Sequence, residues 1–233
     1  MIRRLFIYIF IIIIFSSIKC NNSAPTTPKQ DEISFWPLTV GNKWCFQSYC
    51  IKDNNKYNVD STVFTIINER NISFQNQSVL VNEIQLSRNN DINYIKQEDD
   101  GIYFYGIVTP SDTLIFKNLF LKYPCSKGER WKYKIYGITL ENKIYLSDSI
   151  DVQCINTNVN INTFYGGYTC YEYFFQTINE RDNFTEIFDF HWYISPSIGP
   201  VCIRVQPKHK ANNDDAIYKD DLCEQLIYSY ELK

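Results

Sequence analysis

The chain has 233 residues, of which 45% are hydrophobic and 21% are charged, and its formal net charge is −3. This composition excludes wholesale disorder, and the acidic balance lacks the electrostatic footprint of a nucleic-acid-binding protein. The chain holds 18 Tyr and 16 Phe against 8 Gly and 8 Pro, which favours β structure, because aromatic side chains suit half-buried pleated surfaces.

Residues 1–19 carry the features of a secretory signal. Arg3 and Arg4 give a positive start, and Leu5 to Phe15 form an apolar run of 11 residues. That run is shorter than the roughly 20 residues of a membrane-spanning helix, but it is typical of a signal peptide. Residues 20–32 are polar and contain prolines, which predicts a flexible spacer. We therefore expect the rest of the chain outside the cytoplasm.

Cys20 stands at the junction of the signal and the spacer and leaves three alternatives open. It is a lipid anchor that tethers the protein to a membrane, or cleavage just after it releases a secreted protein, or the signal stays as an uncleaved anchor. The remaining chain is acidic, so it is not drawn to anionic membrane surfaces. Any membrane association is therefore expected to come from the anchor alone.

A pattern of aromatic-Pro-x-x-x-Gly-x-x-Trp-x-aromatic occurs twice, 87 residues apart, from Trp36 to Phe46 and from Tyr123 to Tyr133. Proline fixes φ before a turn, glycine permits a positive φ at the corner, and Trp shares one strand face with the aromatic residue two positions later. Each copy predicts a loop, a tight corner and a strand whose aromatic side chains enter the core. The structural positions are Pro37, Gly41, Trp44, Pro124, Gly128 and Trp131.

Further strands are expected where β-favouring residues lie between clusters of Asn, Asp, Gly and Pro, namely at 63–67, 79–86, 102–105, 150–155, 168–175, 188–194, 201–205 and 226–232. Residues 214–226 are the best helix candidate. We predict one mainly β domain over residues 33–233, an antiparallel curved sheet, sandwich or open barrel built from related halves of about 33–119 and 120–233. A chain of this length buries enough surface to be stable without a cofactor, and none is expected.

Seven cysteines follow Cys20, and in an exported protein they can form disulfides. Because seven is odd, at least one stays free or pairs between chains, and spacing alone does not choose the partners. Cys45 and Cys50 are close enough in sequence to clasp a hairpin. The absence of any C-x-x-C pair disfavours a zinc knuckle or a thioredoxin-like site. The possible disulfide residues are Cys45, Cys50, Cys125, Cys154, Cys170, Cys202 and Cys223.

The sequence offers no catalytic constellation and no metal site. The G-x-S-x-G elbow and the phosphate-binding glycine loops are missing. His191 is predicted as a half-buried strand residue and His209 as a solvated residue in a basic loop, so neither is expected to serve as a base. Adjacent Asp pairs, such as Asp99 and Asp100, are predicted to lie in turns. A hydrolase using acidic residues remains an alternative only if two carboxylates face each other in a cleft.

Several short blocks resemble a known group of proteins. The stretch FWPLTVGNKW from Phe35 to Trp44 is similar to the opening FPL-x-x-GN-x-W of uncharacterised bacterial envelope lipoproteins, which often repeat the Pro-x-x-x-Gly-x-x-Trp block in mid-chain. Gly167 to Tyr171 and Gly199 to Val201 match their later blocks. Lys19, which stands where lipoprotein signals have a small residue, and the many cysteines depart from the pattern. The resemblance implies a β-rich fold and an envelope location, and it supplies no activity.

Two functions follow as expectations. The first is an exported envelope lipoprotein, tethered at Cys20, with a structural or binding role and no enzymatic activity. The alternative is a soluble secreted protein that binds a carbohydrate, or an apolar ligand inside the curve of the sheet. The sequence does not identify the ligand or a protein partner.

Overall fold

We describe the protein from a computed structural model. The structure describes residues 34–87, 91–138, 143–180, 184–211, 218–219 and 221–233. The predicted signal over residues 1–19 and the whole predicted spacer over residues 20–32, with Cys20, lie outside these residues. None of the residues described forms a helix long and apolar enough to cross a membrane.

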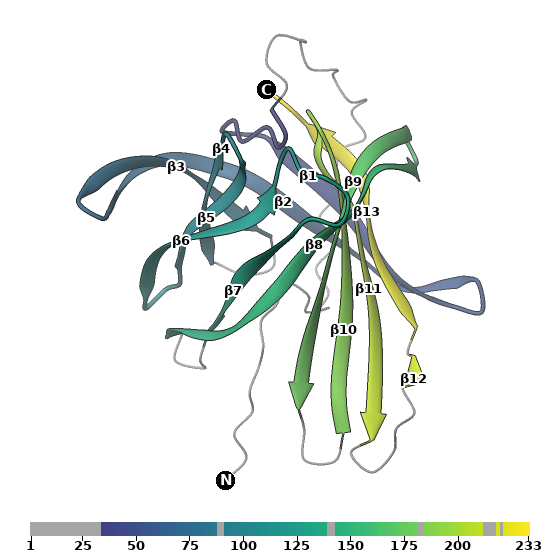
Figure 1. Ribbon diagram of the computed structural model, residues 1–233. Coiled ribbons are helices and arrows are strands. Elements are labelled where there is room, and N and C mark those ends of the chain that lie inside the picture. The colour runs from purple at the N-terminus through teal and green to yellow at the C-terminus, as the bar shows by residue number, and fades with distance from the viewer. Residues whose placement is uncertain (1–33, 88–90, 139–142, 181–183, 212–217, 220) are drawn as a thin grey trace.

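In the described part of the chain, thirteen antiparallel strands form one sheet, and the predicted mainly β class is confirmed (Figure 1). The strands are β1 (Lys43–Lys52), β2 (Asn55–Phe74), β3 (Gln77–Leu86), β4 (Ile92–Glu98), β5 (Gly101–Val108), β6 (Thr113–Lys122), β7 (Arg130–Ile138), β8 (Ile144–Thr163), β9 (Gly166–Glu180), β10 (Phe184–Ser195), β11 (Gly199–Ala211), β12 (Tyr218–Lys219) and β13 (Leu222–Glu231).

The sheet consists of two meanders that meet in its middle. Strands β1 to β6 follow one another as neighbours, as do β7 to β11, and β13 lies between β11 and β1. The short β12 pairs only with β11. Strands β6 and β7 are thus the two edges, although they are consecutive in the chain. The sheet twists and curls until these edges approach each other, which gives a nearly closed barrel (Figure 1).

Side chains close the seam between β6 and β7, where the described sheet has no backbone ladder. The Asn118 side chain donates to the Lys134 carbonyl at 2.8 Å and accepts from the Lys134 amide at 3.2 Å. Asn118 therefore replaces a backbone partner and satisfies groups that an open edge would leave unpaired. Nearby, the rings of Phe116 and Tyr136 stack with their centroids 4.0 Å apart.

The segment before β1 fills the inside of the sheet. Phe35 and Trp36 are buried although they belong to no strand. Phe35 stacks on Tyr123 at 4.1 Å, and Trp36 meets the ring of Trp44 edge to face at 6.0 Å. The Asn82 side chain donates to the Leu38 carbonyl at 2.7 Å and holds the segment on β3. We call residues 34–42 the plug segment.

The two predicted corners have matching backbone geometry. Gly41 and Gly128 each have φ of 90°, a conformation that favours glycine. The Gly41 amide donates to the Ile66 carbonyl at 2.7 Å, and the Ile66 amide donates to the Asn42 carbonyl at 2.9 Å. The second corner repeats both bonds at the same lengths, with Cys154 in the place of Ile66. Each corner thus fastens the start of one meander to its second strand.

The motif residues differ in how deeply they are buried. Trp44 is fully buried, and its indole donates to the Ile198 carbonyl at 2.6 Å. Trp131 is half-buried, packs on the edge of the core, and donates to the Phe120 carbonyl at 3.2 Å across the seam. Pro37 is half-buried and Pro124 is exposed. Both indoles therefore pack on the core, and only the first lies deep within it.

The prediction of a helix over residues 214–226 is wrong at its carboxyl-terminal end, because Leu222 to Leu226 lie in strand β13. Pairing with β1 and β11 on both sides supplies the backbone bonds of β13, so tertiary context overrides a weak local pattern. The expected basic loop around His209 is likewise wrong, since that residue lies in β11. Strands β4 and β6 were not predicted.

Truncation of the two motif tryptophans should distinguish the deep core position of Trp44 from the half-buried position of Trp131 at the seam. Trp44→Ala removes a fully buried indole and its hydrogen bond, and we expect it to lower the free energy of unfolding by about 3–5 kcal/mol. Trp131→Ala should cost about 2 kcal/mol, because the ring is only half-buried. Chemical denaturation followed by circular dichroism measures both losses. Equal losses, or losses near zero, would contradict this assignment.

Candidate functional site

The candidate site is a polar network that crosses five strands of the sheet. On β10, His191 and Tyr193 alternate with Phe190 and Trp192, so their side chains share one face of the strand, and Tyr193 is buried there. Three charged residues from neighbouring strands and a tyrosine from β1 join them. The network comprises Tyr49, Glu172, His191, Tyr193, Arg204 and Glu224.

Strand register brings these residues together. Tyr193 is opposite Glu172, His191 is opposite Arg204, and Glu224 is opposite both Arg204 and Tyr49. Directly opposed residues on neighbouring strands are the closest pairs in a sheet. The network is therefore a row of cross-strand pairs from β9 to β1 that steps along β10 from Tyr193 to His191.

One carboxylate anchors each end of the row. Arg204 Nε donates to Glu224 Oε2 at 2.6 Å, and the Tyr49 hydroxyl donates to the other oxygen of that carboxylate. At the far end, the Tyr193 hydroxyl donates to Glu172 Oε1 at 2.8 Å, and His191 Nδ1 lies 2.9 Å from the same atom. Arg204 links the ends, since its guanidinium donates to the Tyr193 hydroxyl at 3.4 Å.

Both carboxylates are charged at neutral pH. Burial disfavours the charge of Glu224, but hydrogen bonds from Tyr49 and Arg204 outweigh it and lower the pKa of the carboxyl. Burial likewise opposes the charge of Glu172, while His191 and Tyr193 lower its pKa. Burial and the neighbouring carboxylates raise the pKa of Tyr49 and Tyr193, so both phenols stay protonated. The network thus combines the charges of the two glutamates and Arg204 with two neutral phenol donors.

This arrangement is a rigid polar network in which Tyr49, Tyr193 and Glu224 are buried. A general acid needs a carboxyl whose pKa is raised towards neutrality, whereas those of Glu172 and Glu224 are lowered. Both oxygens of Glu224 and one oxygen of Glu172 are already bonded to groups of the protein. Arg204 and His191 keep 37% and 30% of their side chains exposed. These two groups are available to a polar partner at the surface.

The predicted role of His191 as a half-buried strand residue agrees with its place in β10, but sequence reasoning missed the rest of the network. One signal was available, because Glu172, Arg204 and Glu224 are single charges inside otherwise apolar runs. Asp99 and Asp100 form the predicted turn between β4 and β5. The described residues hold no cluster of three or more His, Cys, Asp or Glu side chains that suits a metal ion.

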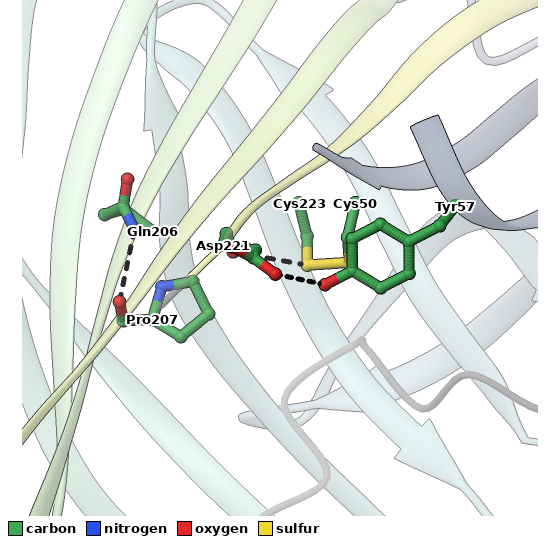
Figure 2. The surroundings of a disulfide bond; sticks show 6 residues. All are labelled: Cys50, Tyr57, Gln206, Pro207, Asp221 and Cys223. Atoms are coloured by element: carbon green, nitrogen blue, oxygen red, sulfur yellow. Dashed lines mark hydrogen bonds between the residues drawn. A yellow bond between two sulfur atoms is a disulfide. The ribbon is translucent and has the colours of Figure 1, made fainter. Parts of the chain in front are cut away.

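Two of the seven candidate cysteines form a disulfide, Cys50 of β1 and Cys223 of β13 (Figure 2). These residues are opposite each other in the strand register. Next to the bond, the Tyr57 hydroxyl donates to Asp221 at 2.7 Å. The clasp between Cys45 and Cys50 does not form, because both lie in one continuous strand, roughly 16 Å apart at about 3.3 Å per residue.

The other five cysteines are thiols in this structure. Cys45 and Cys125 are half-buried, whereas Cys154, Cys170 and Cys202 are buried. Cys20, the predicted lipid anchor, lies outside the described residues.

Comparison with known proteins assigns the chain to no family. No protein-family model matches the chain, and no curated protein matches it. One similar solved structure is a "putative lipoprotein" from Parabacteroides distasonis, with 13% identity, coverage of 86% of this chain and 100% of the other, and a TM-score of 0.46. Another is a "putative exported protein with YmcC-like fold" from Bacteroides fragilis, with 12% identity, coverage of 86% and 100%, and a TM-score of 0.47.

The lowered pKa of Glu224 links the stability of the protein to pH. A carboxyl whose pKa is lower in the folded state stabilises fully above its unfolded pKa, about 4.3, and loses that contribution as the pH falls through the folded value. We expect Glu224→Gln to lower the free energy of unfolding at pH 7 by about 2 kcal/mol, because Arg204 loses its partner. The variant should also lose less stability than the wild type between pH 5 and 2.

Denaturant titrations across that pH range measure both effects. Asp151→Asn is the matched control, since it breaks the exposed ion pair with Lys132 and should change the free energy of unfolding by less than about 0.5 kcal/mol. A Glu224→Gln variant with the stability and the pH dependence of the wild type would contradict the assigned role.

Proposed function

We propose that the protein is an exported cell-envelope protein, tethered by lipid at Cys20, whose β domain has a structural or binding role. The supporting sequence features are the signal over residues 1–19, Cys20 at its end, and the polar spacer of residues 20–32. No activity is assigned, because the two carboxylates of the polar network have lowered pKa values.

The plug segment is the observation that carries this proposal. The Ser34 hydroxyl donates to the Gln97 side chain at 2.9 Å, and the Ser197 amide donates to the Ser34 carbonyl at 2.8 Å. Phe35 is buried immediately afterwards. The chain therefore joins the domain at a point that is fixed from its first described residues. A flexible spacer attached there keeps the whole barrel within reach of an anchor at Cys20.

The binding part of the proposal rests on the polar network. Its rings and charges are held in place by cross-strand bonds, so a partner meets groups that are already ordered. Such preorganisation reduces the entropy cost of binding. The exposed parts of Arg204 and His191 suit a polar partner, and the carboxylates of Glu172 and Glu224 on the flanking strands limit how many anionic groups it can carry.

The alternative, a secreted carbohydrate-binding protein, is favoured by an aromatic group at the tip of the β8–β9 hairpin. Phe164 has 80% of its surface exposed, and its ring lies 5.3 Å from that of Tyr165 and 6.2 Å from that of Tyr228. Exposed rings of this kind are candidates for stacking on sugars. An apolar ligand inside the sheet is less favoured, because Phe35, Trp44 and Tyr173 fill the core there.

Metabolic labelling with a radioactive fatty acid in a bacterial host tests the anchor. We expect the wild-type protein to be labelled and to sediment with membranes, and Cys20→Ala to lose the label. Cys45→Ser is the matched control, since it removes a half-buried thiol of the domain and should remain labelled. Absence of label from the wild type, with the protein found outside the cells, would contradict the anchor and favour the secreted alternative.

A further inference from the structure

The loop between β6 and β7 is fastened to Cys154 of β8 on its carboxyl-terminal side. The Gly128 amide donates to the Cys154 carbonyl at 2.7 Å, and the Cys154 amide donates to the Glu129 carbonyl at 2.9 Å. The Glu129 carboxylate also accepts from the Ser126 amide at 3.0 Å and pairs with Lys122. Cys125 lies between Lys122 and Ser126 in sequence, so its backbone is held on both sides.

The thiols of Cys125 and Cys154 meet inside this frame. They are close enough for each to shift the pKa of the other, and Cys125 Sγ donates to the Tyr173 hydroxyl at 3.7 Å. Tyr173 is the register partner of Cys154 on β9, and its hydroxyl donates to the Lys122 carbonyl at 2.9 Å. The loop and two strands therefore direct both sulfur atoms to one place.

The first corner shows that a thiol pair is not needed to build this frame. Leu38 is the residue that corresponds to Cys125 in the repeated pattern, and Ile66 makes the backbone bonds that Cys154 makes in the second corner. Ile66 is buried, and Leu38 is half-buried against the same core. The second corner has two thiols where the first has two apolar side chains. The thiols add redox reactivity, and the backbone bonds of the corner stay the same.

We propose that Cys125 and Cys154 form a second disulfide through exchange with a low-molecular-weight disulfide. The Cys125 thiolate attacks one sulfur of that disulfide, forms a mixed disulfide and releases one small thiol. Cys154 then gives up its proton, attacks Cys125 Sγ and releases the second small thiol. Two protein thiols are oxidised to one disulfide, and one small disulfide is reduced to two thiols.

The two cysteines are suited to different steps. Cys125 is half-buried between exposed neighbours, so it is the thiol that a small molecule reaches first. The neighbouring Cys154 thiol outweighs burial and lowers the pKa of Cys125. The lower pKa increases the share of Cys125 that is present as the nucleophilic thiolate. The neighbouring Cys125 thiol and burial raise the pKa of Cys154, which fits a thiol that reacts only after its neighbour has been activated.

Peptide mapping of the full chain tests the proposal. The reduced protein is treated with oxidised glutathione and then denatured in the presence of an alkylating agent, which caps the free thiols. The capped protein is digested with trypsin. Cleavage after Lys122 and Lys127 isolates Cys125 in the peptide 123–127. We expect this peptide to be linked to the peptide 144–181, which contains Cys154 and Cys170. Recovery of Cys125 as a free alkylated thiol, or as a stable glutathione adduct, would overturn the proposal.

Three variants assign the bond. The link should persist in Cys170→Ala and disappear in Cys154→Ala, and a link that survives in Cys154→Ala refutes the pairing. The double substitution Cys125→Leu with Cys154→Ile copies the apolar pair of the first corner, so it should keep the fold while removing the reaction. If Cys154→Ala fails to fold, the wild-type and Cys170→Ala maps still decide the pairing.

Discussion

The architecture depends on the stacking of Phe35 on Tyr123. Phe35 belongs to the plug segment before β1, and Tyr123 begins the loop before β7, so one contact joins the starts of the two meanders. The ring planes differ by 9°, and Tyr171 and Tyr173 pack edge-on against Phe35. Stacked pairs contribute about 0.5–1.5 kcal/mol beyond the area they bury. This contact lies where the two sheet edges approach without a backbone ladder.

A sheet that curls without closing has two free edges, and the backbone N–H and C=O groups of those edges need hydrogen-bond partners. Here Asn118 takes the place of a strand partner for Lys134, and the indole of Trp131 bonds the Phe120 carbonyl. On the far side of the sheet, β13 returns to join β11 to β1, and the disulfide between Cys50 and Cys223 fixes that junction. The polar network crosses the same junction. Covalent, ionic and aromatic contacts thus reinforce the places where the meanders meet.

The sequence predicted those features that depend on local geometry. The corners at Gly41 and Gly128 could be recognised because a positive φ and a preceding proline leave a signature within a few residues. The β class followed from the aromatic content. The row from Tyr49 to Glu172 could not be predicted, since it depends on the register of five strands and a shift of one residue moves each side chain to the other face.

The same limit applies to the cysteines and to β13. Cys223 is opposite Cys50 because β13, the last strand, pairs with β1, the first strand. The spacing of the cysteines in the sequence does not predict that pairing. Glu224 interrupts the apolar pattern of β13 because it is paired with Arg204, which obscures the strand in the sequence. Local signals thus predicted the corners, and long-range pairing determined the site.

A double-mutant cycle at Phe35 and Tyr123 tests this account most directly. Phe35→Leu, Tyr123→Leu and the double variant are unfolded in denaturant, and the coupling free energy is taken from the four free energies of unfolding. A coupling of about 0.5–1.5 kcal/mol is expected if the stacked rings join the two meanders. A coupling near zero, with both single variants as stable as the wild type, would contradict it.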